Sequence, residues 1–220
     1  MCVCRNKLFA ELDQIVVKSD HGSKGQANAN ALMFRTGSIA AHRHQVDFYY
    51  RLAQSPAVRT VCEVGFNAGH STLLWLMADP RVRVRAFDLG IHWYSPHVTG
   101  FFDMAFDASR VEVVFGDSQE TLPAFAAAFN SSSPPEFCDL IFVDGDHHYA
   151  AALSDLRNLR AAARPGHHVL LMDDPDHDEV GRAWRAMLAD GVEHFGDVYE
   201  DAHGASVYGA RAAMVYGAYV

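Results

Sequence analysis

Short apolar runs alternate with longer stretches of helical periodicity along most of the chain. The apolar runs, rich in Val, Leu, Ile and Phe, predict β-strands at residues 60–65, 82–88, 111–115, 139–143 and 168–172. The stretches that follow them predict helices at residues 70–78, about 98–107, 119–129, 148–163 and 178–189. Continuous apolar strands separated by helices indicate a parallel sheet that is covered on both faces.

Both ends of the chain depart from this alternation. Residues 192–199 and 210–217 form two strand-like runs without a long helix between them, which predicts an antiparallel hairpin that closes the sheet. Residues 1–55 carry helical pieces, including residues 39–52, and we expect them to form a cap or lid on the sheet. Residues 56–220 are then one α/β domain with a doubly wound, mostly parallel, seven-stranded Rossmann-like sheet.

Composition narrows the classes of partner. Half of the 220 residues are hydrophobic, which suits one well-buried domain, and the formal net charge of −9 argues against binding to a nucleic-acid backbone. No run approaches the roughly 20 apolar residues that span a bilayer, so we expect no membrane partner. Cys62 and Cys138 fall in strand-like runs, where small buried thiols are common, and no CxxC pair is present. We therefore expect a reduced protein of the cytoplasm.

The first predicted strand ends in a glycine-rich turn, VCEVGFNAGHS at residues 61–71. Glycines at such a turn let the backbone approach a ligand and bend sharply into a helix, whose N-terminal amides favour anions. The spacing E-x-G-x-x-x-G-x-S differs from the dinucleotide pattern G-x-G-x-x-G, because Asn67 stands where its second glycine would be. Two glycines in this place often form only a tight turn, so the motif needs support from elsewhere.

That support comes from the ends of the next two predicted strands. Asp88 ends the second strand, and Gly116, Asp117 and Ser118 follow the third. Because the carboxyl ends of parallel strands meet at one edge of the sheet, these polar groups converge with Glu63 of the first strand. An acid after the second strand is well placed to accept hydrogen bonds from the two hydroxyls of a ribose.

A second polar group follows the fourth and fifth predicted strands. Asp144 ends the fourth strand, and Asp173 and Asp174 end the fifth. Neighbouring strand ends lie about 5 Å apart, and carboxylates so close together repel unless a cation neutralises them. Oxygen ligands of this kind suit Mg²⁺ or another divalent cation. Adjacent side chains on an extended strand point to opposite sides, so one alternative is that either Asp173 or Asp174 alone is a ligand. The other is a bend at Pro175 that brings both carboxylates into the site.

Two stretches, VCEVGFNAGHST and GDSQETLPAF, resemble motifs of the class I S-adenosylmethionine-dependent methyltransferases. Within that class they are similar to the metal-dependent O-methyltransferases, both catechol O-methyltransferase-like enzymes and those that methylate sugars of macrolides. The resemblance covers roughly residues 60–175 and implies S-adenosylmethionine as cofactor. The cofactor contacts that it implies come from Glu63, Gly65, Asn67, Gly69, Ser71, Asp88, Asp117, Ser118, Gln119 and Asp144.

The resemblance also implies individual roles. The glycines at 65 and 69 would frame the methionine part of the cofactor, and Ser71 would hold its carboxylate. Asp88 would bind the ribose, and residues 117–119 would border the adenine. Glu63 would orient the glycine loop or meet the amino group. Two residues of the adenine segment also have a simpler structural interpretation: Asp117 forms a turn, and Gln119 starts a helix.

The resemblance makes Asp144, Asp173 and Asp174 the metal ligands and His147, three residues after Asp144, the catalytic base. An imidazole can accept a hydroxyl proton near neutral pH, and a nearby metal makes that proton easier to remove. Of the other polar residues here, we expect Asp146 to cap the following helix and His148 to lie at its start or on the surface. Residues 176–178 are expected to be solvated.

The leading hypothesis is therefore a metal-assisted O-methyltransferase that acts on a hydroxyl of a small molecule. The aromatic segment at residues 90–97 either contacts this acceptor or packs on the sheet, and residues 23–26 and 201–209 are further candidates for its pocket. The alternatives are a non-catalytic cofactor-binding protein of the same fold and a metal-independent methyltransferase acting on N or S. A homodimer is left open.

Overall fold

The computed structural model describes residues 2–19, 43–199 and 213–220. The strands are β1 (Thr60–Val64), β2 (Arg83–Asp88), β3 (Val111–Phe115), β4 (Leu140–Val143), β5 (Val169–Asp173), β6 (Val192–Tyr199) and β7 (Ala213–Tyr219). The helices are α1 (Cys2–Ser19), α3 (Arg43–Ala53), α4 (His70–Ala78), α5 (Ser95–Ala105), α6 (Ser118–Asn130), α7 (Tyr149–Arg160) and α8 (Asp178–Ala189).

All seven strands belong to one sheet in the order β3-β2-β1-β4-β5-β7-β6. Strands β1 to β5 pair in parallel, and β7 runs antiparallel between β5 and β6. The chain moves outward from β1 to β3 and then returns to place β4 beside β1, so the order reverses between β1 and β4. Ligands of doubly wound sheets bind outside the carboxyl ends of the strands at such a reversal. The predicted fold class is confirmed.

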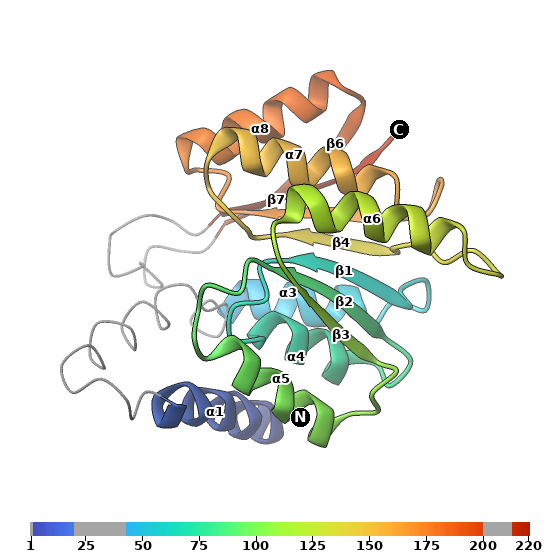
Figure 1. The fold of residues 1–220 in the computed structure, drawn as a ribbon. Coiled ribbons are helices and arrows are strands. Elements are labelled where there is room, and N and C mark those ends of the chain that lie inside the picture. Colours follow the sequence, from blue (N-terminus) through green and yellow to red (C-terminus); the bar gives the residue numbers. More distant parts are fainter. Residues whose placement is uncertain (1, 20–42, 200–212) are drawn as a thin grey trace.

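Helices cover both faces of the sheet: α3, α4 and α5 lie on one side, and α6, α7 and α8 lie on the other (Figure 1). Successive residues of β4 face opposite layers, since Phe142 belongs to the core on the α3–α5 side and Ile141 to the core on the α6–α8 side. The sheet buries apolar side chains on both faces, which explains why the central strands are unbroken apolar runs instead of alternating ones.

The N-terminal helices pack on the α3–α5 side. Helix α1 buries Phe9, Leu12 and Val16 in the same core that receives Val46 and Tyr49 of α3. The expected helix at 39–52 thus corresponds to α3, which starts at Arg43, while residues 39–42 lie outside the described part of the chain. The division into a cap of residues 1–55 and a second domain stays a prediction. Among the described helices, none combines the length and apolar character needed to cross a membrane.

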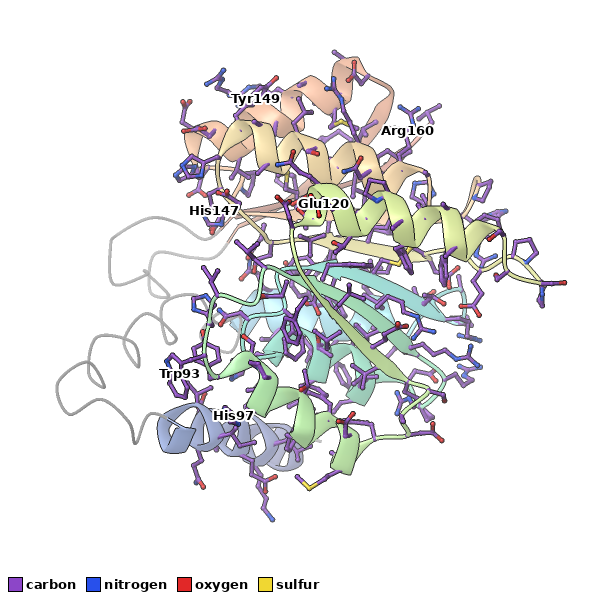
Figure 2. The ribbon with its side chains drawn as sticks, viewed as in Figure 1. Trp93, His97, Glu120, His147, Tyr149 and Arg160 are labelled. Atoms are coloured by element: carbon purple, nitrogen blue, oxygen red, sulfur yellow. A yellow bond between two sulfur atoms is a disulfide. The ribbon has the colours of Figure 1, made fainter. Side chains whose placement is uncertain are left out.

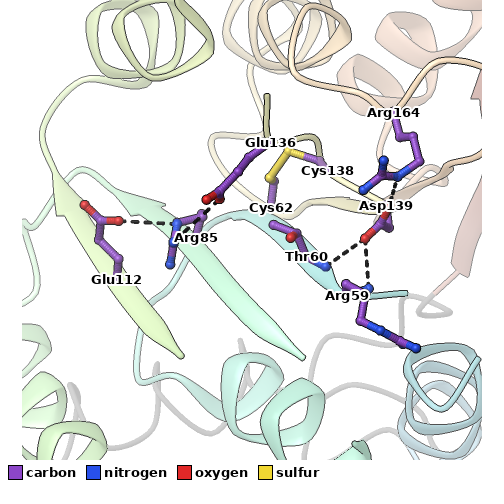
Figure 3. Close-up of a disulfide and its surroundings, with 9 residues drawn as sticks. All are labelled: Arg59, Thr60, Cys62, Arg85, Glu112, Glu136, Cys138, Asp139 and Arg164. Atoms are coloured by element: carbon purple, nitrogen blue, oxygen red, sulfur yellow. Dashed lines mark hydrogen bonds and ion pairs between the residues drawn. A yellow bond between two sulfur atoms is a disulfide. The ribbon is translucent and has the colours of Figure 1, made fainter. Parts of the chain in front are cut away.

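Cys62 and Cys138 form a disulfide, and the prediction of separate reduced thiols was wrong (Figure 3). Cys62 lies in β1, and Cys138 lies just before β4, its parallel neighbour, 76 residues further along the chain. The fold brings the two together because the chain completes β2 and β3 before it returns beside β1. Disulfides persist in oxidising surroundings, so the cysteines no longer support the expectation of a reduced cytoplasmic protein.

Candidate functional site

The glycine-rich turn joins β1 to α4 and packs directly against the end of β4. Gly65 (φ 96°), Asn67 (φ 48°) and Gly69 (φ 74°) all adopt left-handed backbone conformations. A Cβ on Gly65 would lie 1.8 Å from the backbone oxygen of Asp144, so only glycine fits there. The first glycine of the motif is therefore explained by the close approach of two backbones at the reversal in strand order.

Asp88 ties the glycine turn to the segment that follows β2. Its Oδ2 accepts a hydrogen bond of 2.8 Å from the backbone N–H of Asn67, and its Oδ1 accepts one of 2.7 Å from Gly90. The side chain of Asn67 is engaged as well, because Tyr94 donates its hydroxyl proton to Oδ1 of Asn67. Ser95 donates to the carbonyl oxygen of Asn67 at 3.0 Å. The segment at 90–97 thus packs against the turn through Tyr94 and Ser95.

Glu63 lies behind the turn with no solvent exposure. Burial raises the pKa of its carboxyl to about 7, and the neighbouring polar groups of Ser71, Thr72 and Trp75 oppose the rise. The hydroxyl of Thr72 donates to Oε2 of Glu63. These contacts hold the first turn of α4 against β1, which fits the first of the two expected roles of Glu63, orientation of the glycine loop.

The segment after β3 has a different arrangement. Asp117 is exposed and caps α6, because its Oδ1 accepts a hydrogen bond of 2.9 Å from the backbone N–H of Gln119. Asp117 thus lies in the turn before α6 and Gln119 at the start of this helix, in agreement with the simpler structural interpretation of each residue. Ser118 contacts the buried Asp155 of α7, and burial raises the pKa of that acid to about 6 while the bond with Ser118 lowers it. Ser118 and Gln119 remain candidates for the adenine.

Asp144, His147 and Asp174 form a compact group at the ends of β4 and β5. One ligand atom from each lies within 4.8 Å of the others. The His147 Nε2 is 3.5 Å from Asp174 Oδ2 and 3.9 Å from Asp144 Oδ1. Asp174 adopts a left-handed conformation (φ 51°), so the chain bends at this residue and turns its carboxylate toward the other two. Figure 2 shows His147 at the same end of the sheet as Trp93.

Asp173 lies beside this group without belonging to it. Its Oδ1 accepts a hydrogen bond of 2.7 Å from Nε2 of Gln45, a residue of α3. Burial raises the pKa of Asp173, and the charges of Asp144 and Asp174 raise it further. Among the described residues, the group that could hold a metal thus contains two of the three expected acids, together with the expected base.

The chemistry of this group fits a divalent cation. Burial raises the pKa of Asp144 well above its usual range, and the nearby charges of Asp174 and Glu63 raise it further. A cation between the carboxylates would remove this repulsion. Two carboxylates with open positions for water suit Mg²⁺ or Mn²⁺, whereas an imidazole ligand would shift the preference toward softer metals.

A family model described as a methyltransferase domain matches residues 62–175, just over half of the chain. The chain belongs to this methyltransferase family. The matched part begins in β1 and ends just after β5, so it contains the glycine turn, Asp88, and all three members of the acid and histidine group.

Solved structures similar to this methyltransferase share its fold. Cofactor-bound Rv0187 from MTB is 22% identical over 84% of this chain and 88% of its own, with a TM-score of 0.63. An O-methyltransferase from Bacillus cereus in complex with SAH is 19% identical over 94% and 97%, with a TM-score of 0.63. The O-methyltransferase TomG from Streptomyces achromogenes, involved in tomaymycin synthesis and solved with SAM, is 19% identical over 85% and 89%, with a TM-score of 0.61. No curated protein matches the chain. The assignment to the class I methyltransferases is confirmed.

The start of α7 differs from the prediction for this methyltransferase. Asp146 does not cap the helix; its Oδ1 accepts from the backbone N–H of His148 at 3.0 Å and lies 2.6 Å from Nδ1 of the same residue. The cap comes from α8, where Oε2 of Glu179 accepts a hydrogen bond of 2.7 Å from the first N–H of α7, that of Tyr149. Residues 176–178 are exposed, as expected.

Several residues of the site were not predicted from the sequence. Gln45 and Asp155 contact it from α3 and α7, and neither stands in a motif that would have marked it. Tyr94 belongs to the aromatic segment that the sequence analysis singled out, although its contact with Asn67 could not be read from spacing. Residues 23–26 and 201–209, named for the acceptor pocket, lie outside the described residues.

Proposed function

We propose that this protein is an S-adenosylmethionine-dependent O-methyltransferase that uses a divalent cation to methylate a hydroxyl of a small molecule. The observation that carries the proposal is the group of Asp144, His147 and Asp174 beside a glycine turn that is bound to Asp88. The solved O-methyltransferases from Bacillus cereus and Streptomyces achromogenes, in complex with SAH and SAM, support the choice of cofactor.

The cofactor would lie along the carboxyl ends of β1, β2 and β3. The glycine turn and the start of α4, with Ser71, would hold its methionine part, since helix N-termini favour carboxylates. Asp88 uses one lone pair of each oxygen for a backbone N–H, and the remaining lone pairs are free for ribose hydroxyls. Leu89, which is 60% exposed directly after Asp88, offers an apolar surface for the adenine, bordered by Ser118 and Gln119.

Asp144 and Asp174 would hold the cation, and Asp173 would stand next to it. A divalent cation at this place supplies positive charge that makes the proton of an acceptor hydroxyl easier to remove. His147, with its Nε2 turned toward both acids, accepts that proton. The acceptor oxygen then bonds to the methyl carbon while the carbon–sulfur bond breaks, and sulfur keeps the electron pair. The residues of the site align the two partners and exclude other geometries.

The acceptor would bind at the carboxyl ends of the strands, between His147 and the segment after β2. Ile91 of this segment is 72% exposed, and Trp93 lies at the same end of the sheet as His147 (Figure 2). Apolar surface with a few polar groups is typical of pockets for small molecules. The net charge of −9 disfavours a nucleic-acid acceptor.

Calorimetry with SAH and with Mn²⁺, followed by methyl-transfer assays on catechols, other phenols and sugars, tests the proposal. We expect both ligands to bind, transfer to at least one hydroxyl acceptor, and loss of transfer on addition of EDTA. Asp144→Asn and Asp174→Asn should each weaken Mn²⁺ binding, whereas Asp176→Asn, an exposed acid nearby, should not. Absence of SAH binding would overturn the whole proposal, and transfer that resists EDTA would overturn its metal part.

A further inference from the structure

The hydroxyl of Tyr49 is buried beneath the acidic ends of β4 and β5. Tyr49 has no solvent exposure, and no described atom forms a hydrogen bond with its Oη. The ring cannot swing outward, because its centroid lies 4.9 Å from that of Trp75 and 5.1 Å from that of Phe142. A buried hydroxyl without a partner costs on the order of 1–3 kcal/mol. A buried donor held in this way indicates that the hydroxyl has an oxygen acceptor in the functional protein.

The hydroxyl faces acids. Burial is the largest cause that raises the pKa of Tyr49. The negative charges of nearby acids raise it further, with decreasing effect from Asp173 through Asp144 and Asp174 to Glu63. Strand geometry agrees: Phe142 and Leu171 pack in the core on the side of α3, and Asp144 and Asp173 are the residues two positions further along. Their side chains therefore start toward the layer in which Tyr49 lies. A phenol in these surroundings keeps its proton and acts as a donor.

Gln45 takes part from the same helix. It precedes Tyr49 by four residues, so both side chains lie on one face of α3. Gln45 is 1% exposed, and its Nε2 donates to Oδ1 of Asp173 at 2.7 Å. An amide orients a carboxylate without neutralising it, which leaves the charge of Asp173 available to a neighbouring cation.

We propose that Gln45 and Tyr49 are positioning residues of the cation site. Gln45 fixes the carboxylate of Asp173 beside the Asp144–Asp174 pair, and Tyr49 donates a hydrogen bond to the carboxylate or water oxygens between α3 and these acids. The proposal rests on the proposed function, because it assumes that the group binds a divalent cation. It makes α3, within the predicted cap, a working part of the site. Loss of hydrogen bonds to the groups that surround a bound metal typically weakens metal binding about 10- to 100-fold.

The test compares Tyr49→Phe and Gln45→Leu with the full-length wild type. Tyr50→Phe, which removes the same atom from the next residue of α3, is the matched control. Mn²⁺ affinity is measured by titration calorimetry or electron paramagnetic resonance, and the melting temperature is recorded with and without Mn²⁺. We expect each of the two variants to bind Mn²⁺ about 10- to 100-fold more weakly, while Tyr50→Phe binds as the wild type does.

The melting temperatures separate positioning from plain packing. Tyr49→Phe removes a hydroxyl that forms no hydrogen bond within the described part of the chain. The metal-free variant should therefore melt at or above the wild-type temperature, and only the rise caused by Mn²⁺ should shrink. A metal-free variant that melts lower with unchanged Mn²⁺ affinity would overturn the inference. A wild type that binds no Mn²⁺ would instead overturn the metal part of the proposed function, together with this inference.

Discussion

The Nε2 atom of His147 lies 3.5 Å from Oδ2 of Asp174, close enough for both to contact one bound ion. The same nitrogen cannot ligate a cation and accept the proton of the acceptor hydroxyl in the same step. The two roles therefore make opposite predictions for Mn²⁺ affinity when the imidazole is removed.

We expect His147→Ala to behave as the loss of a base. Turnover should fall about 10²- to 10⁴-fold, and Mn²⁺ affinity should stay near that of the wild type. Stopped assays and calorimetry measure these quantities. His148→Ala is the control, since His148 is exposed and contacts Asp146. A marked loss of Mn²⁺ affinity in His147→Ala would identify His147 as a ligand instead.

Gly65 should not tolerate a side chain. In Gly65→Ala the new Cβ would meet the backbone oxygen of Asp144 at 1.8 Å, so β1 and β4 would have to separate at the cofactor turn. We expect loss of SAH binding and a lower melting temperature. Gly100→Ala is the matched control: Gly100 lies in α5 with open space around its Cβ position, so alanine should stabilise by roughly 0.5–1 kcal/mol. Equal SAH affinity in both variants would refute this explanation of the turn.

Glu63 should make stability depend on pH. Its pKa is raised from 4.5 to about 7 in the folded protein, so between these values the unfolded chain loses the proton first. The free energy of unfolding should then fall by at most about 3.4 kcal/mol as pH rises through this window, at 1.36 kcal/mol per pKa unit, and become level above it. In Glu63→Gln this part of the slope should vanish. Urea denaturation at several pH values measures it, and parallel curves for the two proteins would contradict the assignment.

The disulfide predicts a defined peptide pattern. Digestion without reductant should yield a peptide pair joined through Cys62 and Cys138, which mass spectrometry can identify. Reduction should lower the free energy of unfolding by about 2–5 kcal/mol, because the bond closes a long loop. If the two cysteines are found alkylated in the unreduced protein, the link between β1 and the start of β4 is absent.

The parts of the site that the sequence predicted are those set by local pattern and strand adjacency. Asp88 and Asp144 stand directly after apolar runs, and parallel strands bring such ends to one edge. The choice between Asp173 and Asp174 could not be made, because it depends on one backbone angle, the φ of 51° at Asp174. The amino-acid sequence around Asp174 contains no pattern that predicts such a bend.

The contacts that escaped prediction join distant segments. The hydrogen bond from Gln45 to Asp173 spans 128 positions of the chain, and the Cys62–Cys138 bond spans 76. Each depends on which helix lies on which face and which strands are neighbours, and apolar periodicity does not record either. The cap that Glu179 of α8 supplies to α7 was missed for the same reason, in favour of the nearer Asp146.

Asn67 is held from three sides, by Asp88 at its N–H, by Tyr94 at its side chain and by Ser95 at its carbonyl. A loop fixed in this way has already lost its conformational entropy before any ligand arrives. The turn is thus preorganised, and complex formation loses less affinity to the ordering of the backbone. We therefore expect the cofactor to bind without rearrangement of this turn. Its affinity should then be determined mainly by its dissociation rate.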